Sequence, residues 1–195
     1  PLSSTPDVLS WRWTASASYS ASSCYKALFF GACEDPHWRL TWHPWAPLCV
    51  RFFLWLAMLD RCWTAERLAR HGLPHEDTCA LYDQELESMH HLLAACSFLR
   101  QIWHEILGWA RMAIDLPSAD TPFQTWWSSC IDRSPAPVRQ GLSSLIILTA
   151  WWLWKHRNAC IFDRATPSLT LVSDTIKDEA RLWAKAGAKG LLNII

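Results

Sequence analysis

The sequence predicts a mainly α-helical fold, on three observations. From Pro47 onward, apolar residues recur at spacings of three and four, which places them on one face of a helix. Strict alternation of apolar and polar residues, which is typical of a strand, is confined to the first twenty residues. A chain of 195 residues with 51% apolar content can also bury a sizeable core. We therefore expect a helical domain with a short β or extended segment at its N-terminal end.

The first elements follow from local patterns. Residues 11–18 alternate and predict a small hairpin or extended segment, before a helix from about Ser20 to Phe30. Prolines then interrupt the chain. Pro47 can occupy the first turn of the next helix. The apolar face of that helix consists of Val50, Phe53, Leu54, Ala57 and Met58.

In the middle of the chain, side chains that can cap helices predict where the helices begin. Thr64 is a good N-cap for a short helix that stops at Gly72. Ser88 can cap the next helix, and Ser97 the one after it. The buried face of this last helix is expected to hold Ile102, Trp103, Ile106 and Leu107.

The last third of the chain predicts two longer helices. Residues 111–140 contain four prolines, which indicate a loop, a short helix and a second loop. Gly141 is expected to open a long helix through residues 142–162. Ser168 then caps a final helix. The apolar residues of this final helix are Leu169, Val172, Ile176, Ala180 and Trp183.

Composition limits the class of protein. The 15 tryptophans are expected to form the core. Outward stacking on bases is the alternative for Trp11 and Trp13 alone. The most apolar run, residues 142–154, is too short to cross a bilayer. The eight cysteines are scattered, form no Cys-x-x-Cys and follow no signal peptide. We expect a reduced intracellular protein, nuclear or cytoplasmic, without a membrane segment.

One stretch carries metal-binding chemistry. Cys79, His91 and Cys96 stand at the first, third and fourth positions of a Cys-x2-Cys-x8-His-x4-Cys zinc-knuckle pattern, and Tyr82 stands at the second. Tetrahedral zinc takes four thiolate or imidazole donors, and a phenol of pKa near 10 rarely ionises to become one. The sequence therefore predicts a degenerate zinc-knuckle-like unit, a loop followed by a helix.

Helix geometry decides whether these donors can meet. On one continuous helix, residues five apart are separated by about 140°. His91 and Cys96 can face one ion only if the helix breaks before Cys96, and a new cap at Ser97 allows that break. We expect His75, in the preceding loop, to be the best stand-in for the missing donor. The other nearby donors are Asp83, Glu87 and His90.

The residues around this pattern resemble the zinc-binding domain that lies downstream of the polymerase in plant non-LTR (LINE-type) reverse transcriptases. The likeness is close over roughly 7–107 and looser over 140–190. It rests on residues 7–11, 19–25, 42–47, 51–56, 61–64, 67–73, 151–158 and 160–162, besides the knuckle itself. The family usually has a cysteine where Tyr82 stands and a basic residue where Cys49 stands. The resemblance implies a domain at 7–110, a connector at 111–140 and a helical extension at 141–190.

The resemblance also implies a function. It indicates a non-catalytic accessory module of a retrotransposon polyprotein that binds zinc and helps to hold RNA or DNA near the polymerase. No polymerase, phosphate-loop or serine-hydrolase motif occurs in the chain. The alternative is a metal-free helical interaction or relic domain. Metal content would separate the two.

Charge bears on the nucleic-acid partner. Eighteen basic and eighteen acidic residues give a formal net charge of zero, whereas binders of nucleic acid usually carry a basic excess. The clustered cations before the knuckle are Arg51, Arg61, Arg67 and Arg70. They are the predicted nucleic-acid surface, and a solvated helix face is the competing interpretation.

Overall fold

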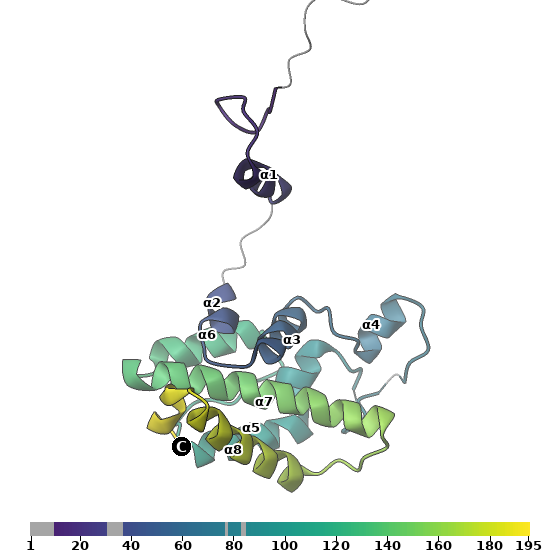
Figure 1. Cartoon of the computed structure of the whole chain (residues 1–195). Helices are drawn as coiled ribbons and strands as arrows, with labels where there is room; N and C mark the ends of the chain where they lie inside the picture. The colour runs from purple at the N-terminus through teal and green to yellow at the C-terminus, as the bar shows by residue number, and fades with distance from the viewer. Residues whose placement is uncertain (1–9, 31–36, 77, 83–84) are drawn as a thin grey trace, which may run out of the picture. The chain divides into compact units, whose positions relative to one another are not determined.

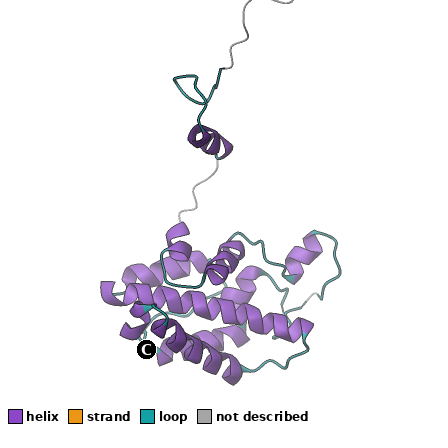
Figure 2. Cartoon of the chain, in the orientation of Figure 1, coloured by secondary structure: helices purple, strands orange, loops and turns teal. Residues whose placement is uncertain are grey.

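The computed structural model describes residues 10–30, 37–76, 78–82 and 85–195. The chain divides into two units, 1–36 and 37–195. The described residues form helices, and the only β pairing among them is an isolated antiparallel bridge between Thr78 and Leu86 (Figure 2). The mainly α fold predicted from the sequence is confirmed. None of the described helices combines the length and apolar character that crossing a membrane requires.

Within residues 10–30, the described part of the first unit, the chain forms one helix, α1 (Ala21–Leu28). It begins with a reciprocal capping box, in which Ser23 N donates to Ser20 Oγ at 3.1 Å and Ser20 N to Ser23 Oγ at 3.0 Å. Residues 11–18 form a closed turn rather than the expected hairpin or extended segment. Trp11 N donates to Ala17 O at 2.8 Å, so the chain folds back before a strand can form.

The second unit starts with three helices, α2 (Trp38–Trp42), α3 (Leu48–Met58) and α4 (Ala65–Arg70). The short α2 was not predicted. Helix α3 follows Pro47 as expected, and its buried residues are Val50, Phe53, Leu54 and Ala57. Thr64 caps α4 by accepting from Arg67 N at 3.4 Å.

Two further elements carry the knuckle. Ser88 caps the turn before η1, a π-helix at His91–Ala95, by accepting from His91 N at 2.9 Å. Helix α5 (Ser97–Trp109) follows directly and buries the four apolar residues predicted for it. The prediction that Ser97 caps α5 is wrong. Cys96 occupies the N-cap position, and Ser97 Oγ is buried with no hydrogen-bond partner among the described residues.

The C-terminal part holds α6 (Phe123–Arg133), α7 (Ala136–Phe162), α8 (Leu169–Lys185) and the 3-10 helix η2 (Lys189–Asn193). Helix α7 begins five residues before Gly141, because prolines are tolerated at Pro135, the N-cap position, and at Pro137, in the first turn. Ser168 caps α8 as predicted, accepting from Leu171 N at 3.3 Å.

Helix α7 runs through the middle of the second unit, with α8 alongside it (Figure 1). It also contacts α3, α5, α6, η1 and η2. Residues 142, 145–148 and 150 of this helix are fully buried. One core is therefore shared between the knuckle region and the C-terminal helices, and the division at 110 and 140 stays a prediction about sequence segments.

A close backbone approach joins the beginning of α7 to η2. A Cβ atom added at Gly141 would lie 2.0 Å from the carbonyl oxygen of Gly190. No side chain fits between these two backbones. Gly141 therefore allows α7 and η2 to approach closely. The prediction that it opens the helix is wrong, because α7 begins at Ala136.

Candidate metal centre

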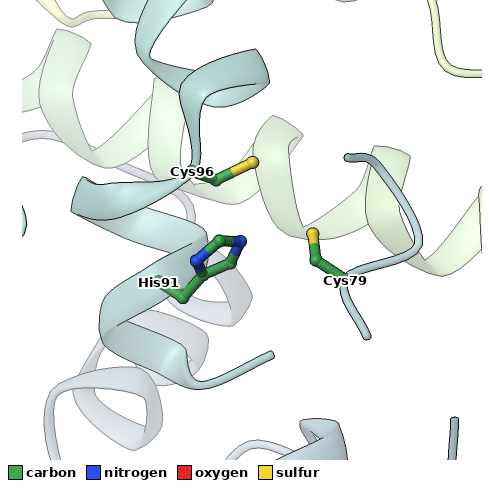
Figure 3. A group of neighbouring side chains, drawn as sticks. All are labelled: Cys79, His91 and Cys96. Carbon is green, nitrogen blue, oxygen red and sulfur yellow. The ribbon is translucent and has the colours of Figure 1, made fainter. Parts of the chain in front are cut away.

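The side chains of Cys79, His91 and Cys96 meet in the second unit. Their ligand atoms lie within 4.8 Å of one another, and the three residues are 0%, 5% and 1% exposed. Figure 3 shows the imidazole and both sulfurs directed toward a common space. The loop that holds Cys79, the π-helix and the residue before α5 each contribute one side chain.

The π-helix places His91 and Cys96 on the same side. Cys96 N donates to His91 O at 2.8 Å, which closes a turn one residue wider than an α-helical turn. Cys96 then leaves the helix, with φ −57° and ψ 122°. The break that the sequence required before Cys96 is present. The wider turn that supports it has no signal in the sequence.

The loop that carries Cys79 is closed by the backbone. Cys79 N donates to Glu85 O at 2.9 Å, next to the bridge between Thr78 and Leu86. Tyr82 N donates to Cys79 O at 3.2 Å in the turn between them. Tyr82 is 45% exposed, whereas the three donors are buried. The second knuckle position therefore holds an exposed phenol, a group that rarely ionises to become a zinc ligand.

The imidazole of His91 is held from one side. Its Nδ1 lies 3.0 Å from the Glu85 carboxylate oxygen Oε2. Its Nε2 is buried and has no hydrogen-bond partner of normal geometry among the described residues. Burial lowers the pKa of His91, but the Cys79 thiol and the Glu85 carboxylate outweigh burial and raise that pKa above its usual value. A buried ring nitrogen that faces a thiol without a hydrogen bond of normal geometry is typical of a metal-ligand position before the metal binds.

The two thiols differ in pKa because they lie next to each other. The hydrogen bond between them lowers the pKa of Cys96 to about 7 and raises that of Cys79. The backbone amides of Leu99 and Phe98, at the start of α5, also lower the pKa of Cys96. One thiolate is therefore available near neutral pH. Two sulfurs and one imidazole nitrogen match three of the four donors of a structural zinc site.

None of the described stand-ins completes the set. His75 Nδ1 lies 2.8 Å from Leu73 O, and His90 Nε2 lies 2.9 Å from Ala119 O. Both are outside the three-donor group. Asp83 lies outside the described residues. The carboxylate of Glu87 binds Arg157 instead.

Glu87 and Arg157 form a buried ion pair between the knuckle region and α7. Arg157 Nε donates to Glu87 Oε2 at 2.8 Å, and a second guanidinium nitrogen binds Glu87 Oε1. The Arg157 side chain is 3% exposed and the Glu87 side chain 1%. Glu87 also accepts from Ala65 N at 3.1 Å at the start of α4, and the Arg157 guanidinium lies 5.0 Å from the centre of the Trp154 ring. The cationic run at 155–157 thus contains a structural arginine.

The four predicted arginines are not one free basic face. Arg67 donates to Asp60 O at 2.9 Å, and Arg70 pairs with the Asp60 carboxylate. Arg51 instead donates to Ala46 O at 2.8 Å, near the start of α3. Arg61 is exposed. The structure brings Arg67 and Arg70 together around Asp60, and part of their charge is neutralised there.

Trp63 is an exposed aromatic residue that the sequence did not single out. It is 50% exposed, with the Arg67 guanidinium 5.1 Å from its ring centre and the His71 ring at 5.5 Å. It borders a cavity of about 840 Å³ beside the knuckle loop. The apolar lining of this cavity includes Leu68, Leu73, Pro74, Ile161 and Phe162. Trp13 and Trp38 are also exposed, at 39% and 46%, so the expectation that the tryptophans form the core fails at these positions.

A helical frame with three converging buried donors defines the chain as a candidate metal-binding domain. Residues 19–103 match the family described as zinc-binding in reverse transcriptase, and this segment is a reverse transcriptase zinc-binding domain of retrotransposon origin. A putative ribonuclease H protein of Arabidopsis thaliana is 26% identical over 164 residues, which cover 82% of this chain. The chain spans only 26% of the length of that relative. No solved structure matches the chain.

Proposed function

We propose that this chain is a non-catalytic zinc-binding accessory module of a LINE-type retrotransposon polyprotein, and that it assists the binding of RNA or DNA. The observation that carries the proposal is the group of three buried donors, Cys79, His91 and Cys96. The family match over 19–103 supports zinc as the metal. The plant relative, of whose length this chain spans 26%, supports a longer polyprotein as the context. The proposed place of action is the nucleus or cytoplasm.

Zinc in this place would act structurally. The loop, the π-helix and the start of α5 already pack in one core, and zinc would add a direct tie between them through these three side chains. Structural zinc stabilises small zinc-finger peptides by roughly 10–16 kcal/mol. With three donors from the chain, binding is expected to be weak, and zinc should be present at less than one ion per molecule after mild chelation.

The test compares zinc per chain in three proteins after dialysis against a mild chelator. Tyr82→Cys restores the second donor and should retain one zinc per chain. Tyr82→Phe keeps the ring without the hydroxyl and should match the unmodified chain. One zinc in the unmodified chain would mean that a fourth donor exists, with Tyr82 or His75 as candidates. A Tyr82→Cys protein without zinc would refute the zinc function.

A second candidate function is a metal-free helical interaction or relic domain. The exposed phenol of Tyr82 at the second ligand position favours it, as does the formal net charge of zero. In this candidate, the shared core alone holds the loop and α5 in place. Metal-free Tyr82→Cys protein with unchanged thermal stability would support it.

Nucleic-acid binding is assigned to the side of α4 that carries Arg67 and Arg70, with Arg61 and Arg51 as the outer members. Contacts to phosphate should be weak and fall steeply with salt. The double variant Arg67→Glu, Arg70→Glu should lose affinity for single-stranded RNA. The control, Arg181→Glu with Lys185→Glu on α8, makes the same charge change elsewhere. Equal affinity of both double variants would exclude this surface.

A further inference from the structure

Glu85 contacts two of the three donor residues at once. Its backbone oxygen accepts from Cys79 N at 2.9 Å, and its carboxylate Oε2 lies 3.0 Å from His91 Nδ1. Glu85 thus closes the loop at one end with its main chain and reaches the π-helix with its side chain. No position of the knuckle pattern includes this residue.

The contact with Glu85 fixes which nitrogen of His91 carries a proton. An ionised carboxylate only accepts hydrogen bonds, so Nδ1 must be the donor. In the neutral ring Nε2 then has a free lone pair, and this buried atom has no partner of normal geometry among the described residues. Figure 3 shows the His91 ring directed toward the two sulfurs. The tautomer set by Glu85 is therefore the one that can bind a metal through Nε2.

The exposed position of Glu85 keeps the desolvation cost of this contact small. The Glu85 side chain is 66% exposed, whereas that of His91 is 6% exposed. The carboxylate therefore keeps most of its hydration while it orients a buried ring. Glu87, two residues later, cannot take this role because its carboxylate is bound to Arg157 and to Ala65 N.

We propose that Glu85 is the positioning residue of this metal site, which holds His91 with Nε2 facing the two thiols. The inference rests on the proposed metal-binding function, but it concerns the orientation of His91 and is testable in metal-free protein. In metalloproteins, loss of such a hydrogen-bond partner weakens metal binding by about 10-fold to 100-fold.

The experiment uses the full chain and three variants. Glu85→Ala removes the acceptor, Glu85→Gln keeps an acceptor oxygen without the charge, and Glu76→Ala removes an exposed acid from the same loop as a control. Nitrogen-15 spectra of the His91 ring report the tautomer with and without metal. Cobalt(II), as a probe for the zinc site, and zinc itself are titrated against a competing chelator.

Glu85→Ala should lose the Nδ1–H tautomer as the dominant form and bind cobalt and zinc about 10-fold to 100-fold more weakly. Glu85→Gln should recover the tautomer and most of the affinity, and Glu76→Ala should behave as the unmodified chain. Unchanged His91 spectra in Glu85→Ala would overturn the inference, with or without metal. If the unmodified chain binds no metal while Glu85→Ala alters the tautomer, the positioning role stands and the zinc function fails.

Discussion

Substitution of Arg157 should destabilise the second unit more than any single substitution at the surface, because it leaves the buried carboxylate of Glu87 without a counter-charge. Glu87 is 1% exposed and would lose both guanidinium contacts, keeping only Ala65 N as a side-chain partner among the described residues. Breaking a buried pair by removing one partner costs about 3–5 kcal/mol. For a unit of this size, 1 kcal/mol lowers the melting temperature by about 2–4 °C, so Arg157→Met should lower it by about 6–20 °C.

The assay is thermal unfolding followed by helical circular dichroism at neutral pH. Lys155→Met, at an exposed position two residues earlier, is the control and should shift the midpoint by only a few degrees. The double variant Glu87→Gln, Arg157→Met leaves no buried charge and preserves an acceptor for Ala65 N, so it should recover much of the loss. A midpoint for Arg157→Met within about 2 °C of the unmodified chain, or a double variant no better than the single, would refute this account of the pair.

Three further outcomes are expected. Gly141→Ala should destabilise the fold by about 1–3 kcal/mol or more in denaturant unfolding, because its Cβ would meet a backbone carbonyl at 2.0 Å, whereas Gly108→Ala, with nothing within 4 Å, should be neutral or stabilising. Lys177 lowers the pKa of Glu105 through a hydrogen bond. The stability that Glu105 contributes should therefore be present above its usual pKa and disappear as the pH falls through the lowered pKa. Glu105→Gln should lower the free energy of unfolding at pH 7 by at most about 1 kcal/mol, and should not lower it at acidic pH. Trp63→Ala should weaken binding of single-stranded RNA by about 1–3 kcal/mol per stacked base without lowering the melting temperature, and unchanged affinity would remove this residue from the binding surface.

Helix starts were the part of the fold best predicted from sequence. Ser20, Thr64, Ser88 and Ser168 all accept a hydrogen bond from the backbone amide three residues ahead, as a capping side chain does. Such caps depend on a few adjacent residues, so they can be read from a single sequence. Apolar periodicity likewise predicted the buried faces of α3 and α5.

The errors have physical reasons of two kinds. Ser97 has the residue type of a cap, but the chain turns at Cys96, and the wider π-helical turn that decides this leaves no pattern in the sequence. Gly141 was expected to mark a helix boundary because glycine is uncommon inside helices. In the structure it lies within α7 and permits close contact with the backbone of Gly190. Both outcomes depend on tertiary structure, which overrides local preference.

The candidate site divides in the same way. The spacing of Cys79, His91 and Cys96 predicted that they meet on condition of a helix break before Cys96, and the structure has both the break and the group of donors. The partner of His91, Glu85, and the partner of Glu87 were not predictable. Glu87 and Arg157 are 70 residues apart, and no local pattern links residues over that distance.

The separation between the knuckle and α7 also orders events during synthesis. A ribosome adds about 5–20 residues per second, so roughly 60 residues between Cys96 and Arg157 take about 3–12 seconds to appear. During that interval all three donors have left the ribosome or are leaving it, while the helix that later completes their surroundings does not yet exist. A metal ion then has a free route to the sulfurs and the imidazole. Once α7 packs, the donors are 0–5% exposed, and any exchange must wait for the fold to open.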